Sequence, residues 1–465
     1  MSRTLALVTC VLFGCPGAQV RSKPVVAPPD EVSRLQGLES QAFLLATSLC
    51  DVAGQRFSGS AGSALAVTWG VETMKRLGLE NVHTEPVMVP KWTRLSEEAR
   101  IVSPLAQPLA ITALGHSVST PEGGLEAEVV EVESLEALTA LKPDSLKGKW
   151  LFANVAMRRT VDGAGYGAVA SVRHLAGVQA LAAGAVGALI RSVGTDTNRL
   201  GHTGSQGADF AKLPAAALAV PDADLLHRLL RGGPVKVNVK LITKEEAPVE
   251  SANVVGEVLG RERPDEVVLL GAHLDSWDLG TGALDDGAGV GIVLDVARAL
   301  QTLPQRPRRT VRVVLFANEE NGLGGAKAYG LAHQGELGKH VLAMEADSGS
   351  DRARAVRLLS ADGARAAFLS WGPWLTPLGV VVEPDDAGGG ADTSVLRAAG
   401  VPQLDVRQDA SRYFDFHHTA NDTVDKLDEP QLTQAARAFS TMTWLVAEQP
   451  VDFGRVPEDK RARKR

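Results

Sequence analysis

A set of acidic and histidine side chains falls in a few short motifs and could together bind divalent metal ions. They are His273 and Asp275 in HLDSWD, Asp285 and Asp286 in ALDDGAG, Glu319 and Glu320 in FANEENG, Asp347 in MEADSG, and His417 and His418 in FHHTANDT. Carboxylate oxygens and imidazole nitrogens are the ligands that zinc and related metals take in hydrolytic sites. The residue types therefore point to metal-assisted chemistry.

Each motif has an ordinary structural explanation when it is taken alone. A single histidine near a carboxylate is often only a satisfied polar residue, an acidic pair after a strand is usually a solvated loop, and an aspartate can cap a helix. The combination is different because the motifs follow one another at the ends of apolar segments. We therefore interpret them together as candidate ligands of one site.

Paired metal ions require this mixture of residue types. Two cations held close together repel each other, and a bridging carboxylate such as Asp285 offsets that repulsion. Adjacent residues of an extended segment point to opposite sides, so one of Glu319 and Glu320 can bind metal while the other accepts the proton of a bound water. Asp275 lies two residues after His273 and can accept a hydrogen bond from its imidazole, which would fix the tautomer.

Apolar strands lead directly into these motifs. EVVLLGAHLD, RVVLFANEE and HVLAMEAD are the strand candidates, and helices predicted over residues 288–300 and around 325–333 alternate with them. This alternation predicts an α/β fold whose sheet is covered by helices on both faces. Because ligand sites of open α/β sheets form at the carboxyl ends of strands, we expect the motifs to meet at one edge. Residues 31–49 have helical periodicity as well.

The composition changes between about Gly115 and Thr243. Short strand candidates are separated by glycine-rich turns and by an alanine-rich helix near residues 178–184; they are AEVVEV, KGKWLFANV, AVGALIRSV, LPAAALAV and VKVNVKLI. We interpret residues 116–244 as an inserted β-rich module. Residues 30–115 and 245–450 then form one discontinuous domain.

The overall charge excludes a large class of partners. The chain has 465 residues, a net charge of -7 and a pI of about 5.9, without the basic face or stripe that nucleic-acid binding requires. Its one basic run lies in the tail 455–465, which we expect to be disordered. Cys50 is the one cysteine beyond the leader, and its apolar neighbours predict a buried thiol without a disulfide.

The first residues have the pattern of an export signal. Arg3 is followed by LALVTCVLFGC, an apolar run that is too short to span a membrane but suits a signal peptide over residues 1–15. The quartet LFGC is similar to a bacterial lipobox ending at Cys15, although Phe13 departs from the usual small or aliphatic residue. We expect an exported protein that is secreted, periplasmic or lipid-anchored, with Cys15 as its one membrane attachment.

The order of the motifs resembles the co-catalytic dizinc exopeptidases. HLDSWD, GALDDGAG, FANEENG, MEADSG and FHHTANDT carry this resemblance, and GLENVHTEPVMVPKWTR, LIRSV and HTGSQ extend it to the carboxypeptidase Q family over nearly the whole mature chain. The resemblance implies the zinc exopeptidase fold, a mixed β-sheet flanked by helices on both faces. It also implies that the insert is a protease-associated domain and that the protein is a homodimer.

The resemblance assigns roles residue by residue. It implies two zinc ions per chain; the implied ligands of the first are His273, Asp285 and Asp347, and those of the second are Asp285, Glu320 and His418. Asp285 is preferred to Asp286 as the bridge because the bridging residue of the family follows a glycine-x-hydrophobic step, here Gly282 to Leu284.

The accessory residues are implied in the same way. Glu319 is the expected general base and Asp275 the expected carboxylate behind His273. His418 is preferred to His417 as a ligand because it directly precedes Thr419. His417 then stands where relatives present a group toward the tetrahedral intermediate.

The implied activity is hydrolysis of dipeptides or short peptides. A dizinc aminopeptidase acting on longer peptides is one alternative, because for a dipeptide both modes cleave the same bond. A catalytically silent receptor or binding module is the other alternative, and it predicts missing ligands, whereas every ligand position is filled here.

Overall fold

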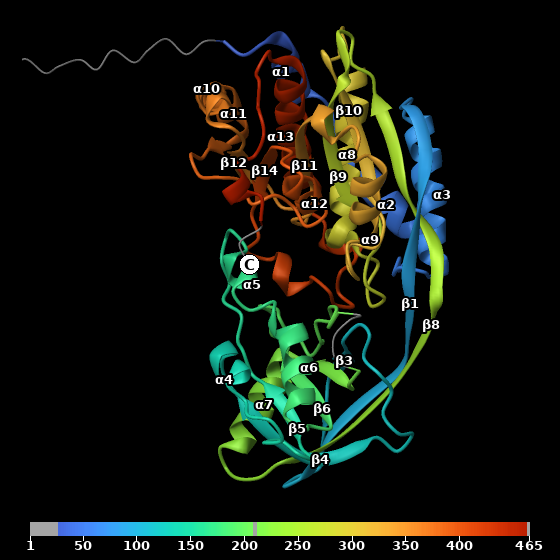
Figure 1. Cartoon of the computed structure of the whole chain (residues 1–465), viewed down its shortest axis with the longest axis vertical. Coiled ribbons are helices and arrows are strands. Elements are labelled where there is room, and N and C mark those ends of the chain that lie inside the picture. The colour runs from blue at the N-terminus through green and yellow to red at the C-terminus, as the bar shows by residue number, and fades with distance from the viewer. Residues whose placement is uncertain (1–26, 208–211, 463–465) are drawn as a thin grey trace, which may run out of the picture.

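The computed structural model describes residues 27–207 and 212–462 and has two lobes (Figure 1). Two long antiparallel strands run along both lobes, namely β1 (Glu80–Ser103) and β8 (Lys236–Val258). The larger lobe contains the candidate ligands. We call the other the small lobe and define it as β2 (Gln107–Leu109) to α7 (Val220–Leu230).

The sheet of the large lobe places the predicted motifs on neighbouring strands. Its order is β13-β12-β14-β11-β9-β10-β8. The strands besides β8 are β9 (Arg263–His273), β10 (Arg309–Phe316), β11 (His340–Glu345), β12 (Ala353–Leu359), β13 (Val381–Val382) and β14 (Gln403–Gln408). Strands β10, β9, β11 and β14 are parallel, whereas β8 and β12 pair antiparallel, so the sheet is mixed as expected.

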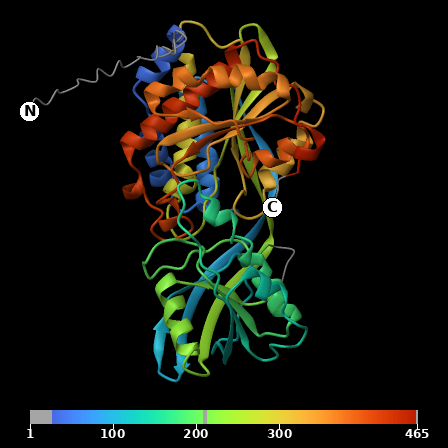
Figure 2. The ribbon, with the colours of Figure 1, turned by 90° about the vertical axis from the view of Figure 1, so that its left-hand side faces the viewer.

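Helices cover both faces of this sheet. One face packs on α1 (Asp30–Gly37), α2 (Ala42–Ala53), α3 (Ala61–Arg76), α8 (Ala288–Gln301), α10 (Arg365–Ser370), α11 (Gly372–Leu375) and α13 (Glu429–Glu448). The other face packs on α9 (Gly324–Ala332) and α12 (Thr393–Ala398). Helix α8 lies between α2, α13 and the sheet, which explains why nearly all of its residues are buried. Figure 2 shows these layers from the side.

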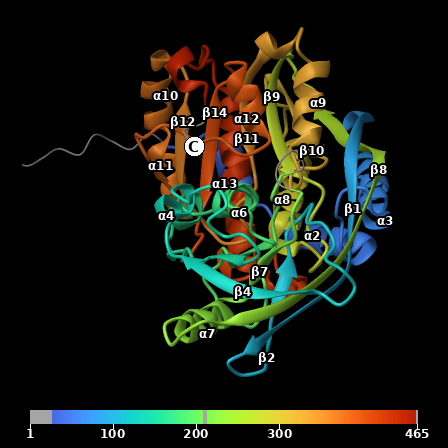
Figure 3. The ribbon, with the colours of Figure 1, turned by 60° about the horizontal axis from the view of Figure 1, so that its bottom comes forward.

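The small lobe has its own parallel strands. These are β4 (Leu125–Val132), β5 (Trp150–Ala153), β6 (Gly187–Arg191) and β7 (Ala215–Leu218), with β3 (Ile111–Ala113) antiparallel at the edge. Helices α4 (Leu135–Thr139), α5 (Ala164–Gly167), α6 (Val172–Ala182) and α7 accompany them. Figure 3 shows this lobe from below, with β4 and α7 toward the viewer.

Most predicted elements are present, and two have different bounds. The helix expected over residues 31–49 is interrupted at 38–41, so α1 and α2 are separate. Strand β8 is continuous through residue 245, where the boundary of the insert was expected. It continues because every residue from 236 to 257 except a few at bulges has a pairing partner on β1.

The C-terminal tail was expected to be disordered, but the structure describes it as far as residue 462, with a short 3-10 turn at Glu458–Lys460. Arg397 donates to the carbonyl of Lys460, and Lys460 forms an ion pair with Asp386 at 2.7 Å. These contacts hold residues 458–460 against the large lobe. The predicted signal peptide and Cys15 lie outside the described residues.

Two further sequence expectations concern single features. Cys50 is buried and free, as predicted. Among the described residues, no helix combines the length and the hydrophobicity needed to cross a bilayer.

Candidate metal centre

Three parallel strands end at the candidate centre. Strand β9 ends at His273, β10 ends three residues before Glu319, and β11 ends two residues before Asp347. The register pairs Phe316 with His273 and Glu345 with Gly271, so β9 and β10 end at one level and β11 ends two residues earlier, at the same edge of the sheet. The expected meeting of these motifs at one sheet edge is therefore observed.

The first group of candidate ligands lies around His273. Its Nε2 is 3.1 Å from Oδ1 of Asp285 and 3.8 Å from Oδ1 of Asp347. One ligand atom from each of these three residues lies within 4.8 Å of the other two. This spacing is suited to a single cation.

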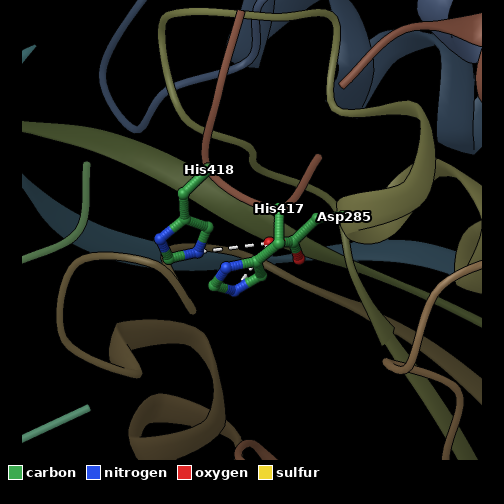
Figure 4. A group of neighbouring side chains, drawn as sticks. All are labelled: Asp285, His417 and His418. Atoms are coloured by element: carbon green, nitrogen blue, oxygen red, sulfur yellow. Dashed lines mark ion pairs between the residues drawn. The ribbon is translucent and has the colours of Figure 1, made fainter. Parts of the chain in front are cut away.

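The second group lies on the other side of Asp285. Oδ2 of Asp285 is 3.2 Å from Nε2 of His418 and 3.4 Å from Nε2 of His417 (Figure 4). Nε2 of His418 is also 3.0 Å from Oε2 of Glu320. Asp285 thus has one oxygen in each group.

His417 lies almost as close to Asp285 as the expected ligand His418 does. Its ring stacks on that of His418 with 3.6 Å between centroids, and both rings face Asp285. Asp285, His417 and His418 together satisfy the spacing for one cation. His417 therefore lies within ligand distance of Asp285 as well, beside the expected Glu320.

Asp275 contacts His273 in another way than predicted. Nδ1 of His273 is 3.0 Å from the backbone oxygen of Asp275 and 3.9 Å from its carboxylate. The carboxylate instead accepts hydrogen bonds from the backbone N–H of Glu319 and the hydroxyl of Ser58. The backbone oxygen fixes the tautomer of His273, while the carboxylate of Asp275 holds the backbone of Glu319.

Glu319 and Glu320 have separate environments. The Glu320 carboxylate contacts His418. The carboxylate of Glu319 forms no ion pair or hydrogen bond with the side chain or backbone of another described residue. Burial raises the pKa of Glu319 well above its ordinary value, and the carboxylates of Glu320 and Asp347 add to this increase. A free carboxylate beside the ligands is the arrangement that a general base requires.

The centre contains more negative than positive groups. Burial raises the pKa of Asp347 to about 7, and the Asp285 carboxylate adds to the increase while His273 opposes it. Burial opposes the charged form of His418, but Glu320 and Asp285 raise its pKa to about 9. Oε1 of Glu320 is buried without a hydrogen-bond partner among the described residues. Buried carboxylates of this kind are stable when cations neutralise them.

Two aspartates that the sequence analysis did not assign hold the loop of Asp285. Asp422 accepts the backbone N–H groups of Leu284 and Asp285 at 2.7 and 3.1 Å. Asp286 accepts the backbone N–H of His273 at 3.0 Å. Both lie within the quoted motifs FHHTANDT and ALDDGAG, but their role depends on contacts that the motifs do not reveal.

The small lobe contacts the histidine pair directly. The carbonyl oxygen of Thr203 is 3.1 Å from Nδ1 of His418, and the backbone N–H of Thr203 donates to the carbonyl of His418 at 3.0 Å. The ring of His202 is 2.8 Å from the carbonyl oxygen of His417. Residues 202–203 therefore orient the imidazole of His418.

Comparison with known proteins adds independent evidence. A model of the family described as Peptidase family M28 matches residues 253–443. Carboxypeptidase Q of Mus musculus is 36% identical over 403 residues, which cover 86% of this chain and 84% of the mouse protein. Carboxypeptidase Q of Homo sapiens is 34% identical over 406 residues, with the same coverage.

Solved structures agree with the fold. The crystal structure of a peptidase M28 precursor from Shewanella amazonensis has a TM-score of 0.89 and 42% identity, and the match covers 92% of this chain and 97% of that one. A zinc aminopeptidase from Bacillus subtilis has a TM-score of 0.63 and 20% identity, covering 90% of this chain and 98% of that one. At that identity, the second match shows the fold alone.

Proposed function

We propose that this chain, which belongs to peptidase family M28 and is a metallopeptidase, binds two zinc ions and hydrolyses dipeptides or short peptides. The observation that carries the proposal is the bridging position of Asp285, which has one carboxylate oxygen in each of two ligand groups. Carboxypeptidase Q relatives at 34–36% identity support the substrate class.

The spacing of the candidate ligands supports zinc. Four ligand atoms at about 2.0 Å from one tetrahedral ion lie roughly 3.3 Å from each other. The separations from His273 and His418 to their carboxylate neighbours are 3.0 to 3.8 Å. The donor set of imidazoles and carboxylates, with an unpaired buried oxygen on Glu320, fits the same ion.

The residues that would hold the ions are those of the two groups. His273, Asp285 and Asp347 would hold the first ion, and Asp285, Glu320 and His418 the second. When bound, the zinc ions lower the pKa of a water molecule and polarise the scissile carbonyl.

Glu319 then performs the proton transfers. Its carboxylate accepts the proton of the attacking water and returns it to the leaving amine. Asp275 positions Glu319 through the backbone hydrogen bond at 2.9 Å. His417 lies beside Asp285 and can donate to the oxyanion of the tetrahedral intermediate.

An aminopeptidase acting on longer peptides is the second candidate. The similarity to leucine aminopeptidase 2 of Arthroderma otae, which is 29% identical over 276 residues, supports this aminopeptidase activity as an alternative. A silent binding module is the third candidate, and the complete set of ligand side chains argues against it. For the small lobe, we propose a protease-associated insert over residues 116–244 that borders the substrate.

A panel of small peptides tests the proposal. Release of free amino acids is measured from a dipeptide, its N-acetyl form, its C-terminal amide and a longer peptide, with and without a zinc chelator. Chelator-sensitive cleavage of the free dipeptide alone would support the dipeptidase. Cleavage of the amide and of the longer peptide from the amino end would indicate an aminopeptidase, and no cleavage with added zinc would contradict peptidase activity.

Metal content provides a separate check on the number of ions. Elemental analysis of the purified protein is expected to give two zinc ions per chain, and the Asp285→Ala variant is expected to lose both. Retention of one ion in that variant would contradict the bridging role of Asp285.

A further inference from the structure

We infer that Arg173 of the small lobe binds the free C-terminal carboxylate of the substrate. This inference rests on the proposed function, because it places the substrate at the candidate metal centre. It goes further by identifying a residue that selects between the carboxypeptidase and aminopeptidase modes.

Arg173 is a buried cation with unused hydrogen-bond donors. It belongs to α6, and only 5% of its surface is exposed. Nη1 donates to the hydroxyl of Tyr166 at 2.6 Å, whereas Nε and Nη2 are buried without a hydrogen-bond partner. No carboxylate among the described residues forms an ion pair with it. A buried guanidinium without an anion is costly, so an anionic ligand would stabilise this arrangement.

Two contacts place this guanidinium beside the candidate centre. Tyr166, its hydrogen-bond partner, has its ring centroid 5.1 Å from that of His417. On the other side, a Cβ atom on Gly204 would lie 2.4 Å from Nε of Arg173. Gly204 directly follows Thr203, whose carbonyl contacts His418. Arg173 therefore lies against the same segments that orient the histidine pair.

The backbone at Gly204 leaves room for Arg173. Gly204 has a φ of 149°, and any side chain there would overlap the guanidinium. The small lobe thus brings a positive group to the edge of a centre that is otherwise rich in carboxylates. The guanidinium of Arg173 also lies over the ring of Tyr166, with its Cζ atom 5.3 Å from the ring centroid, and this contact limits the movement of the guanidinium.

A terminal carboxylate is the anion that fits this place. Two free N–H groups on a planar fork match the two oxygens of a carboxylate. In a dipeptide, one residue of about 3.5 Å separates the scissile nitrogen from that carboxylate, so a scissile bond at the metal centre keeps the carboxylate close to it, where Tyr166 and Gly204 hold Arg173. A substrate cleaved far from its carboxyl end places no such charge there.

The first experiment compares kinetics on a free dipeptide and its C-terminal amide. Arg173→Gln is expected to raise KM for the free dipeptide at least about 30-fold, with a smaller change in kcat, because a buried charge pair is lost. Hydrolysis of the amide, which the proposed dipeptidase cleaves slowly or not at all, is expected to change little wherever it is measurable. Arg173→Lys, which keeps the charge without the fork, should lie between the wild type and Arg173→Gln.

Arg191→Gln is the matched control. Arg191 lies in the same lobe and pairs with Asp224 at 2.6 Å, away from the centre. It is expected to leave both substrates unaffected. Equal losses on the free dipeptide and the amide in Arg173→Gln, or no loss on either, would overturn the inference. Thermal unfolding of each variant separates loss of folding from loss of binding, and Arg173→Lys retains the test if Arg173→Gln does not fold.

The second experiment does not depend on catalysis. Calorimetry measures binding of leucine and of leucinamide to the zinc-loaded wild type and to the Arg173 variants. Weaker binding of leucine alone in Arg173→Gln would support the carboxylate site even if no peptide were hydrolysed, in which case only the proposed function would fail. Unchanged leucine binding in a protein that hydrolyses dipeptides would overturn the carboxylate site and leave the proposed function intact.

Discussion

The two sides of Asp285 are built differently. On one side, His273 ends β9 and Asp347 follows β11, and the backbone pairing of these two parallel strands sets their distance. On the other side, His418 lies in a loop that β-pairing does not hold, and the small lobe orients it through Thr203. We call the His273 group the sheet side, because both of its residues besides Asp285 are placed by the sheet. We call the His418 group the loop side, because contact between lobes orients its histidine and only Glu320 in it follows a strand.

The largest expected effect concerns Glu319, the proposed general base, which follows β10 of the central sheet. Glu319→Gln is expected to lower kcat about 10²–10⁴-fold, because it removes the proton acceptor. Zinc content and thermal stability should remain near wild type. Elemental analysis beside steady-state kinetics checks this.

The neighbouring Glu320 gives a matched control. Glu320→Gln makes the same chemical change one residue away and is expected to lower zinc content as well as kcat. If Glu319→Gln lost zinc to the same extent, the two residues would not divide the tasks as proposed.

A smaller effect tests the loop side directly. His202→Ala removes the contact with the carbonyl of His417 and should weaken one of two zinc-binding steps about 10–100-fold, as changes behind metal ligands commonly do. The other step, on the sheet side, should keep its affinity. Competitive zinc titration resolves the two steps.

His227→Ala serves as the control in the same lobe, where His227 pairs with Glu131 at 2.9 Å. It should leave both steps unchanged. Equal weakening of both steps in His202→Ala would show that the two sides of Asp285 are not independent.

The smallest expected effect concerns a second group of carboxylates and a histidine, which lies outside the candidate metal centre. Elsewhere, His333 lies 2.6 Å from both Glu85 and Glu336. Burial opposes its charged form, but the two carboxylates raise the pKa of His333 above 6.5. Charged His333 therefore contributes stability that is fully present below about pH 6.5 and is lost as the pH rises through the raised value.

His333→Gln should accordingly be less stable than the wild type at pH 5–6, by at most about 1 kcal/mol, and the difference should narrow above pH 8. Denaturant unfolding over this pH range measures it. If the stability difference between His333→Gln and the wild type grew with pH, the two carboxylates would not stabilise the charged form of His333.

The sheet side could be predicted from the sequence to a large extent. Each candidate ligand there ends or follows an apolar strand, and the rule for carboxyl ends of parallel strands brings them together. The strands of the small lobe were also visible, because each is a short apolar run between glycine-rich turns.

The loop side could be predicted only in part. The motif FHHTANDT marked the histidine pair, but nothing local to HTGSQ indicates that Thr203 contacts His418, and nothing local to Arg173 distinguishes it from a surface arginine. The continuity of β8 was missed for the same reason, since its partner on β1 lies more than 130 residues away. Contacts between distant segments leave no period or spacing in the sequence.

The pairing of β1 with β8 has a consequence for how the chain tolerates change. Arg94 pairs with Thr243, so the chain leaves the large lobe and returns to it at the same point. For the large lobe, everything between these residues is a single closed loop, and doubling the length of a flexible loop costs only about 0.6 kcal/mol in closure entropy. Insertions and deletions in the small lobe that avoid its contacts with the large lobe, among them Arg159 and residues 202–205, should therefore leave the folding of the large lobe nearly unchanged.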